Sequence, residues 1–95
     1  MKALLITRFR DIAETGDGIE MVVWRVPDPV EPSTHGYKYR LVYLEGSRRV
    51  VGFDNERGKG DHKHVGENEI PYVFINVDRL IDDFIAEVEN WKNAL

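Results

Sequence analysis

Residues 37–44 constrain the fold most strongly, because side chains of two kinds alternate along this segment. One face would carry Tyr37, Tyr39, Leu41 and Tyr43, and the other face Lys38 and Arg40. Strict alternation is typical of a β-strand with one buried face. A turn at 45–47 then leads into residues 48–53, so the two segments predict a β-hairpin. We expect the tyrosine row to face the core; stacking on nucleic-acid bases is the alternative.

A second hairpin is predicted near the start of the chain. Residues 3–12 and 19–26 are rich in β-branched and large apolar side chains, and the glycines within 14–18 allow a turn between them. The next segment, 27–35, contains three prolines, which remove backbone donors and restrict φ. This segment therefore predicts a stiff connector rather than a helix or a central strand.

The last third of the chain predicts a short strand followed by a helix. Residues 72–75 favour a strand, and Asn76 is a suitable helix N-cap. Beyond Asn76, apolar side chains recur at steps of three and four residues, the pattern of an amphipathic helix. The members of this stripe are Leu80, Ile81, Phe84, Ile85, Val88, Trp91 and Leu95.

Together the elements predict an α+β fold, in which an antiparallel sheet of four to five strands, built from two hairpins, packs against one C-terminal amphipathic helix. Residues 54–68 are rich in glycine, charge and histidine, and we expect a long polar loop at the sheet edge. At 95 residues, the chain is expected to form a single domain, 1–95. An exposed sheet edge would allow a homodimer.

Composition excludes several classes of protein. With 42% hydrophobic and 32% charged residues, the chain is neither a disordered polymer nor a membrane protein, and no apolar run approaches the roughly 20 residues of a membrane span. Arg8 and Arg10 interrupt the opening apolar residues too early for a secretion signal. The absence of cysteine excludes disulfides, a thiol nucleophile and a thiolate zinc site. We expect a cytoplasmic protein.

Charge is unevenly distributed along the chain, although the net charge is only −4. Residues 34–64 hold seven basic and four acidic side chains together with all three histidines, whereas residues 65–95 hold two basic and seven acidic ones. A positive centre in an acidic protein indicates an anion-facing site; ordinary scatter of surface charge is the alternative.

The segment 52–64 concentrates the groups that could carry out chemistry. Two imidazoles near neutral pKa and several cations are the parts needed to cleave a phosphodiester by its ribose 2′-hydroxyl. We therefore predict His62, His64 and Lys59 as catalytic residues. The predicted substrate-binding residues are Arg57, Lys63, Arg40, Asp54, Asn55 and Asp61.

Two other interpretations of these residues remain open. Asp61, His62 and His64, with His35 or Asp54, offer nitrogen and oxygen ligands suited to a transition metal. Alternatively, the glycines and charges only satisfy loop geometry and hydration. Because the Gly-Lys-Ser/Thr ending of a P-loop is absent, ATP binding is not predicted, and we expect no cofactor.

The strings Tyr39-Arg40-Leu41-Val42-Tyr43 and Val51-Gly52-Phe53-Asp54-Asn55-Glu56-Arg57-Gly58-Lys59-Gly60-Asp61-His62-Lys63-His64 resemble the signature of TumE-like toxins. The resemblance extends to residues 22–27 and 80–84, and so covers most of the chain. Two positions depart from the pattern: Phe53 replaces an expected Tyr, and Lys63 an expected Arg. The resemblance implies a growth-inhibiting toxin encoded beside a DNA-binding helix-turn-helix antitoxin.

From the residues and the resemblance we expect the toxin of a type II toxin–antitoxin pair that acts on RNA as a small ribonuclease. In this hypothesis His62 and His64 transfer protons, Lys59 and Arg57 stabilise phosphate, and Asp61 or Asp54 orients an imidazole. The alternative is a non-catalytic module that binds a protein partner or nucleic acid within a regulatory pair.

Overall fold

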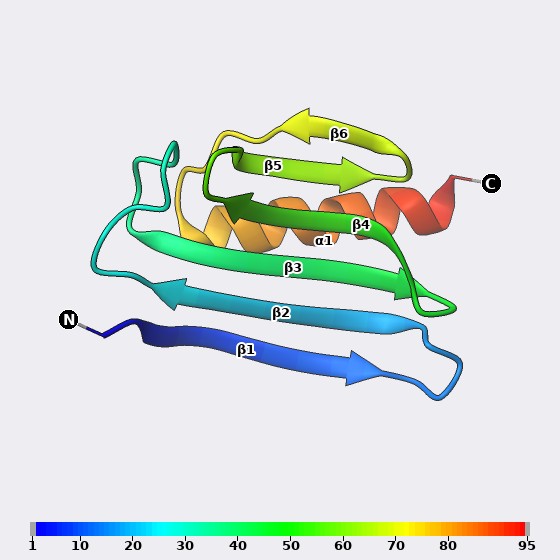
Figure 1. The fold of residues 1–95 in the computed structure, drawn as a ribbon. Coiled ribbons are helices and arrows are strands. Elements are labelled where there is room, and N and C mark those ends of the chain that lie inside the picture. Colours follow the sequence, from blue (N-terminus) through cyan, green and yellow to red (C-terminus); the bar gives the residue numbers. More distant parts are fainter. Residues whose placement is uncertain (1, 95) are drawn as a thin grey trace.

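The computed structural model describes residues 2–94 as one antiparallel sheet and one helix (Figure 1). The elements in chain order are β1 (Leu4–Ile12), β2 (Gly18–Arg25), β3 (Tyr37–Glu45), β4 (Arg48–Glu56), β5 (Gly60–Val65), β6 (Asn68–Pro71) and α1 (Val77–Asn93). Each strand pairs with its sequence neighbour, so the strand order in the sheet is β1-β2-β3-β4-β5-β6. The predicted α+β class and both predicted hairpins are confirmed, but the sheet has more strands than expected.

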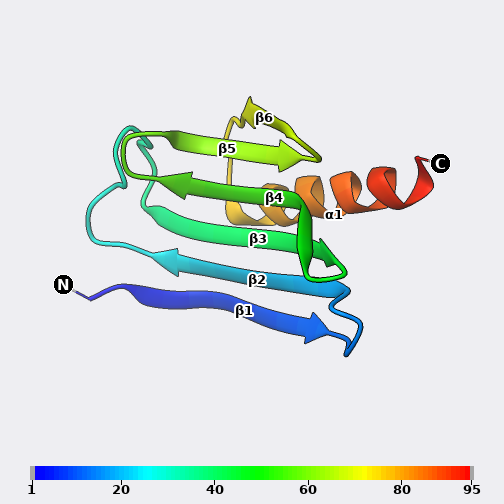
Figure 2. The same ribbon diagram turned by 45° about the vertical axis from the view of Figure 1, so that its right-hand side comes forward.

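The helix covers one face of the sheet and packs mainly against β4. Figures 1 and 2 both place α1 behind the β3–β5 part of the sheet, while β1 and β2 extend beyond it. The core between the two layers combines helix residues with the inward side chains of the central strands. Its buried members are Val23, Tyr39, Leu41, Tyr43, Val50, Val51, Phe53, Leu80, Phe84 and Val88.

The helix begins where the sequence predicts it. Asn76 is the N-cap, and its side-chain oxygen accepts a hydrogen bond from the backbone N–H of Arg79 at 2.7 Å. The predicted apolar stripe supplies the buried residues Leu80, Phe84 and Val88. Leu95, the last expected member of the stripe, lies outside the described residues.

The expected loop at 54–68 is wrong, because most of this segment is paired strand. β4 continues to Glu56, a tight turn follows, and β5 then runs antiparallel to β4 along its whole length. Gly58 and Gly60, with φ of 88° and 77°, allow the backbone to reverse within this turn. The sequence did not predict β5, because polar side chains occupy both faces of this strand and no hydrophobic alternation marks it.

The expected strand at 72–75 is also wrong. β6 ends at Pro71, and the residues that follow have no regular structure until α1 begins. This segment carries the chain from the sheet edge to the helix layer, and its aromatic side chains pack on the core on the way. The ring of Tyr72 lies edge-on to Phe53 at 5.0 Å, and the ring of Phe74 stacks on His35 at 3.8 Å.

The sheet face opposite α1 carries no covering layer in the part of the chain that the structure describes, and we call it the open face (Figures 1 and 2). Side chains alternate along each strand, so the pairing register determines which residues share this face. One cross-strand row contains Arg8, Val22, Arg40, Asp54, His62 and Pro71, and the next contains Arg10, Glu20, Val42, Gly52, His64 and Glu69.

No helix within residues 2–94 is both long enough and apolar enough to span a bilayer.

The packing of α1 predicts a sharp contrast between two neighbouring helix residues. Phe84 is fully buried with its ring edge-on to Phe53, whereas Ile85 is 36% exposed. We expect Phe84→Ala to lower the free energy of unfolding by about 3–5 kcal/mol, because it leaves a cavity in the core. Ile85→Ala should cost about 1 kcal/mol or less. Urea unfolding followed by circular dichroism measures both values, and equal losses would contradict this packing.

Candidate active site

The β4–β5 hairpin positions the candidate site at one side of the open face. In its register Asp54 lies opposite His62, and Gly52 lies opposite His64. His62 and His64 are two residues apart on one strand, so both imidazoles project from the same face, with ring centroids 5.0 Å apart. The strand thus brings together the two predicted catalytic histidines with Asp54.

His62 is held from two sides. Its Nδ1 lies 2.9 Å from the carbonyl oxygen of Gly60, which can only accept, so this nitrogen carries a hydrogen and donates it. Its Nε2 lies 2.5 Å from Oδ1 of Asp54. His62 is 4% exposed and Asp54 8%, so the pair is almost fully removed from water. Neither facing atom has a partner with hydrogen-bond geometry among the described residues.

His64 is the more accessible imidazole of the two, and no hydrogen bond to its ring is present among residues 2–94. Partial burial lowers the pKa of His64, and the nearby cation Arg49 lowers it further. Gly52 opposite it has no side chain, and the aliphatic part of Arg49 covers the space where a Cβ would be. His64 is therefore biased towards the neutral form, which can accept a proton.

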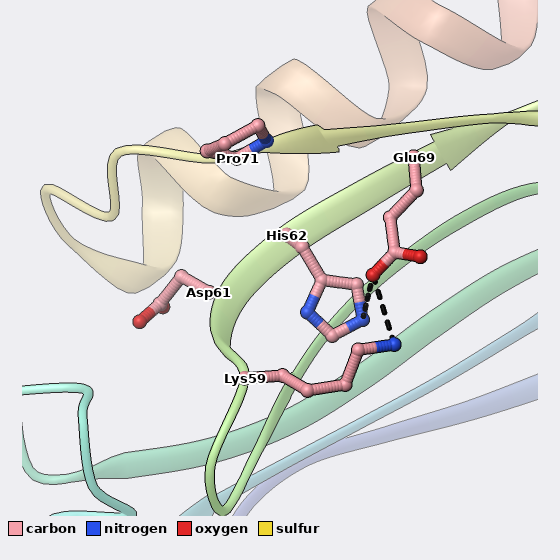
Figure 3. Close-up of a pocket in the computed structure, with 5 residues that line it drawn as sticks. All are labelled: Lys59, Asp61, His62, Glu69 and Pro71. Carbon is pink, nitrogen blue, oxygen red and sulfur yellow. Dashed lines mark ion pairs between the residues drawn. The ribbon is translucent and has the colours of Figure 1, made fainter.

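A pocket of about 380 Å³ opens next to His62, lined by Lys59, Asp61, His62, Glu69 and Pro71. Figure 3 shows the Glu69 carboxylate facing both Lys59 and His62, with Asp61 pointing away from them. Nζ of Lys59 lies 2.9 Å from Oε1 of Glu69, and Nε2 of His62 lies 3.9 Å from the same oxygen. The hydrogen bond to Glu69 raises the pKa of Lys59, so Lys59 remains a cation at the mouth of the pocket.

Further cations extend from this pocket across the open face. The strand register and the β4–β5 turn place six cationic side chains there: Arg8, Arg10, Lys38, Arg40, Arg49 and Lys59. The acidic side chains on the same face are Glu20, Asp54, Glu56 and Glu69. Glu20 bridges two of them, at 3.1 Å from Arg10 and 3.5 Å from Arg40. An excess of cations on this face of a chain with net charge −4 favours an anionic ligand.

On the opposite side of β5, which faces the helix layer, the side chains have a structural role. Asp61 accepts hydrogen bonds from the hydroxyl of Ser33, from Nε2 of His35 at 2.6 Å and from the hydroxyl of Tyr39 at 2.7 Å. Nδ1 of His35 accepts from the backbone N–H of Tyr37, which leaves its hydrogen on Nε2 for Asp61. This network ties the proline-rich connector to the sheet.

Four predicted binding residues lie away from the open face. Asn55 is fully buried and bonds the backbone of Tyr37 and Tyr39. Asp61 belongs to the network just described, and Lys63 pairs with Glu87 of α1 at 2.7 Å. The remaining one, Arg57, lies in the β4–β5 turn and lines a separate pocket with residues of the proline-rich connector. Of the predicted substrate-binding set, Arg40 and Asp54 lie on the open face.

Sequence reasoning missed several residues of this face. Arg8 and Arg10 are far from the glycine-rich segment in sequence and join it only through strand pairing, whereas Arg49 lies three residues before this segment, on β4. Trp24 also lies on this face, opposite Lys38 in the β2–β3 register and half-buried. The spacing of Arg8 and Arg10, two apart in a predicted strand, was a signal that both share one face.

The fold and the site define a small α+β protein whose cation-rich open sheet face ends in a buried carboxylate–imidazole pair. The family model described as Toxin TumE matches residues 4–92, nearly the whole chain, so the chain belongs to the TumE toxin family. Membership makes it the toxin component of a toxin–antitoxin system and implies an antitoxin partner. No curated protein and no solved structure matched the chain significantly.

The Asp61 network predicts a pH-dependent contribution to stability. Burial alone would raise the pKa of the Asp61 carboxyl, but hydrogen bonds from Ser33, Tyr39 and His35 outweigh it and hold the pKa below its usual value. A lowered pKa stabilises the folded state above the pKa of the unfolded chain, and this stabilisation is lost as pH falls through the folded value.

We expect Asp61→Ala to lower the free energy of unfolding at pH 7 by about 2–3 kcal/mol, since three donors lose a charged acceptor. The difference from wild type should shrink as the pH is lowered below about 4. Urea unfolding across this pH range measures it, with the exposed Asp82→Ala as the control. A difference that does not change with pH would contradict the assigned role.

Proposed function

We propose that this protein is a type II toxin that inhibits growth by cleaving RNA at the open face. The observation that carries the proposal is that strand pairing gathers His62, His64 and Asp54 beside a surface with an excess of Lys and Arg side chains. RNA is a polyanion with a nucleophile, the 2′-hydroxyl, next to each scissile phosphate, so cations and a proton-transfer pair are the groups that its cleavage requires.

His64 is the general base of the proposed reaction, because it is the accessible imidazole and its ring has no partner among the described residues. It takes the proton from the 2′-hydroxyl, whose oxygen then attacks the phosphorus atom. His62 acts in its imidazolium form, in which Nε2 carries a proton and faces Asp54 beside the pocket, and it gives this proton to the departing 5′-oxygen. The products are a 2′,3′-cyclic phosphate and a 5′-hydroxyl.

Lys59 and Arg49 supply positive charge to the proposed phosphorane, since one lines the pocket and the other lies beside His64. Arg40 and the cations of β1 bind the flanking phosphates along the open face. Trp24, half-buried beside Lys38, offers an aromatic surface on which one base can stack.

The proposed partner is a helix-turn-helix antitoxin protein: the type II class requires a protein antitoxin, and the family resemblance implies the helix-turn-helix type. The homodimer expected from the sequence would use β1, which has no second strand partner within residues 2–94. Its exposed apolar residues include Leu4 and Phe9.

Removal of the proposed base should abolish toxicity and RNA cleavage together. We expect His64→Ala to reduce cleavage of total cellular RNA by purified protein about 10²–10⁴-fold, the usual contribution of a general base. Cleavage ends should carry 2′,3′-cyclic phosphate and 5′-hydroxyl groups, and cleavage should persist in excess chelator. Growth after induced expression, with soluble protein quantified, is the cellular measurement. Full toxicity of both folded His62→Ala and His64→Ala proteins would refute the proposed roles.

Arg49 and Arg48 provide a matched pair that tests the open face. Consecutive strand residues point to opposite faces, so Arg49 lies beside His64 whereas Arg48 does not. We expect Arg49→Ala to lower cleavage at least about tenfold, through lost charge stabilisation of the phosphorane, and Arg48→Ala to leave it near wild type. Equal effects would contradict cleavage at the open face. Growth arrest that requires stoichiometric protein, without RNA turnover, would indicate a binding module.

A further inference from the structure

The pair formed by Asp54 and His62 has an electrostatic feature that a metal ion would explain. Nδ1–H of His62 donates a hydrogen bond to the carbonyl oxygen of Gly60. In the neutral ring the other nitrogen, Nε2, therefore presents a lone pair. This lone pair faces a carboxylate oxygen at 2.5 Å, and neither atom has a partner with hydrogen-bond geometry among the described residues. Two buried acceptors this close repel one another unless a proton or a metal ion lies between or beside them.

A third ligand lies next to this pair. One ligand atom from each of Asp54, His62 and His64 can be chosen so that all three lie within 4.8 Å of one another. A tetrahedral ion with bonds of about 2.0–2.1 Å holds its ligands roughly 3.3 Å apart. The separation of His62 Nε2 from Asp54 Oδ1, 2.5 Å, is shorter than this value, and no pair in the set is farther apart than 4.8 Å. Binding an ion would therefore move these two atoms apart by side-chain rotation.

The surroundings of the set also suit a metal ion. A metal-bound histidine usually donates its other ring N–H to a backbone carbonyl or carboxylate, as His62 does to Gly60. Glu69, whose Oε1 lies 3.9 Å from Nε2 of His62, supplies further negative charge at the edge (Figure 3).

We propose that Asp54, His62 and His64 form a binding site for a divalent first-row transition ion, with Zn²⁺ as the best-matched probe. Two imidazoles and one carboxylate supply nitrogen and oxygen donors. A set with two imidazoles binds such ions in preference to Mg²⁺ or Ca²⁺. The carboxylate of the set is Asp54. Asp61 and His35, which the sequence offered as alternative ligands, are bound to each other in the network that holds the proline-rich connector.

The test uses the untagged full chain, stripped with chelator and titrated with ZnCl₂ by calorimetry, without RNA. We expect one ion per chain with a Kd of about 1 µM or tighter, and a Co²⁺ derivative with the visible absorption of a tetrahedral site. His64→Ala should weaken binding at least about tenfold. Asp54→Asn is the second ligand variant, and His35→Gln, outside the set, should bind like wild type.

Binding weaker than about 1 mM in wild type, or equal affinity in wild type and folded His64→Ala, would overturn the proposal. The metal site does not rest on the proposed RNA cleavage, and the titration contains no RNA, so either proposal can fail alone. If both hold, the ion occupies the ring nitrogens that take up and return protons in the cleavage reaction. Zn²⁺ should then inhibit cleavage at concentrations near its measured Kd.

Discussion

The register of the β4–β5 hairpin is the constraint on which the rest of the site depends. It places Asp54 opposite His62 and Asn55 opposite Asp61, so neighbouring residue pairs serve opposite faces of the sheet. The even-numbered pair forms the buried carboxylate–imidazole contact on the open face. The odd-numbered pair anchors the proline-rich connector and the start of β3 on the helix side. A slip of one residue would exchange these roles and destroy both sites at once.

The sheet also converts a charge pattern along the chain into a separation of charge in space. The basic middle of the sequence forms β3, β4 and β5, whose open side carries Lys38, Arg40, Arg49 and Lys59. Most of the acidic last third forms α1, on the other face, while Glu69 of β6 lies on the open face. Two of its carboxylates, Asp83 and Glu87, satisfy Tyr72 and Lys63 on the helix side of the sheet. An acidic protein thus retains a face suited to a polyanion.

The parts of the fold that the sequence predicted are those with a strong periodic signal. The alternation at 37–44, the glycines between the first two strands and the apolar stripe after Asn76 each correspond to an element of the structure. β5 gave no such signal, because its residues are polar on the open face and partly polar on the helix face. The segment 72–75 wrongly predicted a strand. Its β-branched and aromatic residues also suit an irregular segment that packs on the core between β6 and α1.

The sequence by itself determined which chemical groups are available and that His62 and His64 share a side wherever the chain is extended, because side-chain direction in a strand has a period of two. It also indicated the toxin family, through a string of residues that is local in the chain. Only the tertiary structure decided which carboxylate each histidine meets: Asp54 for His62 and Asp61 for His35. Strand pairing makes that choice, because the partners are distant in sequence and their contact depends on a register that no single segment encodes.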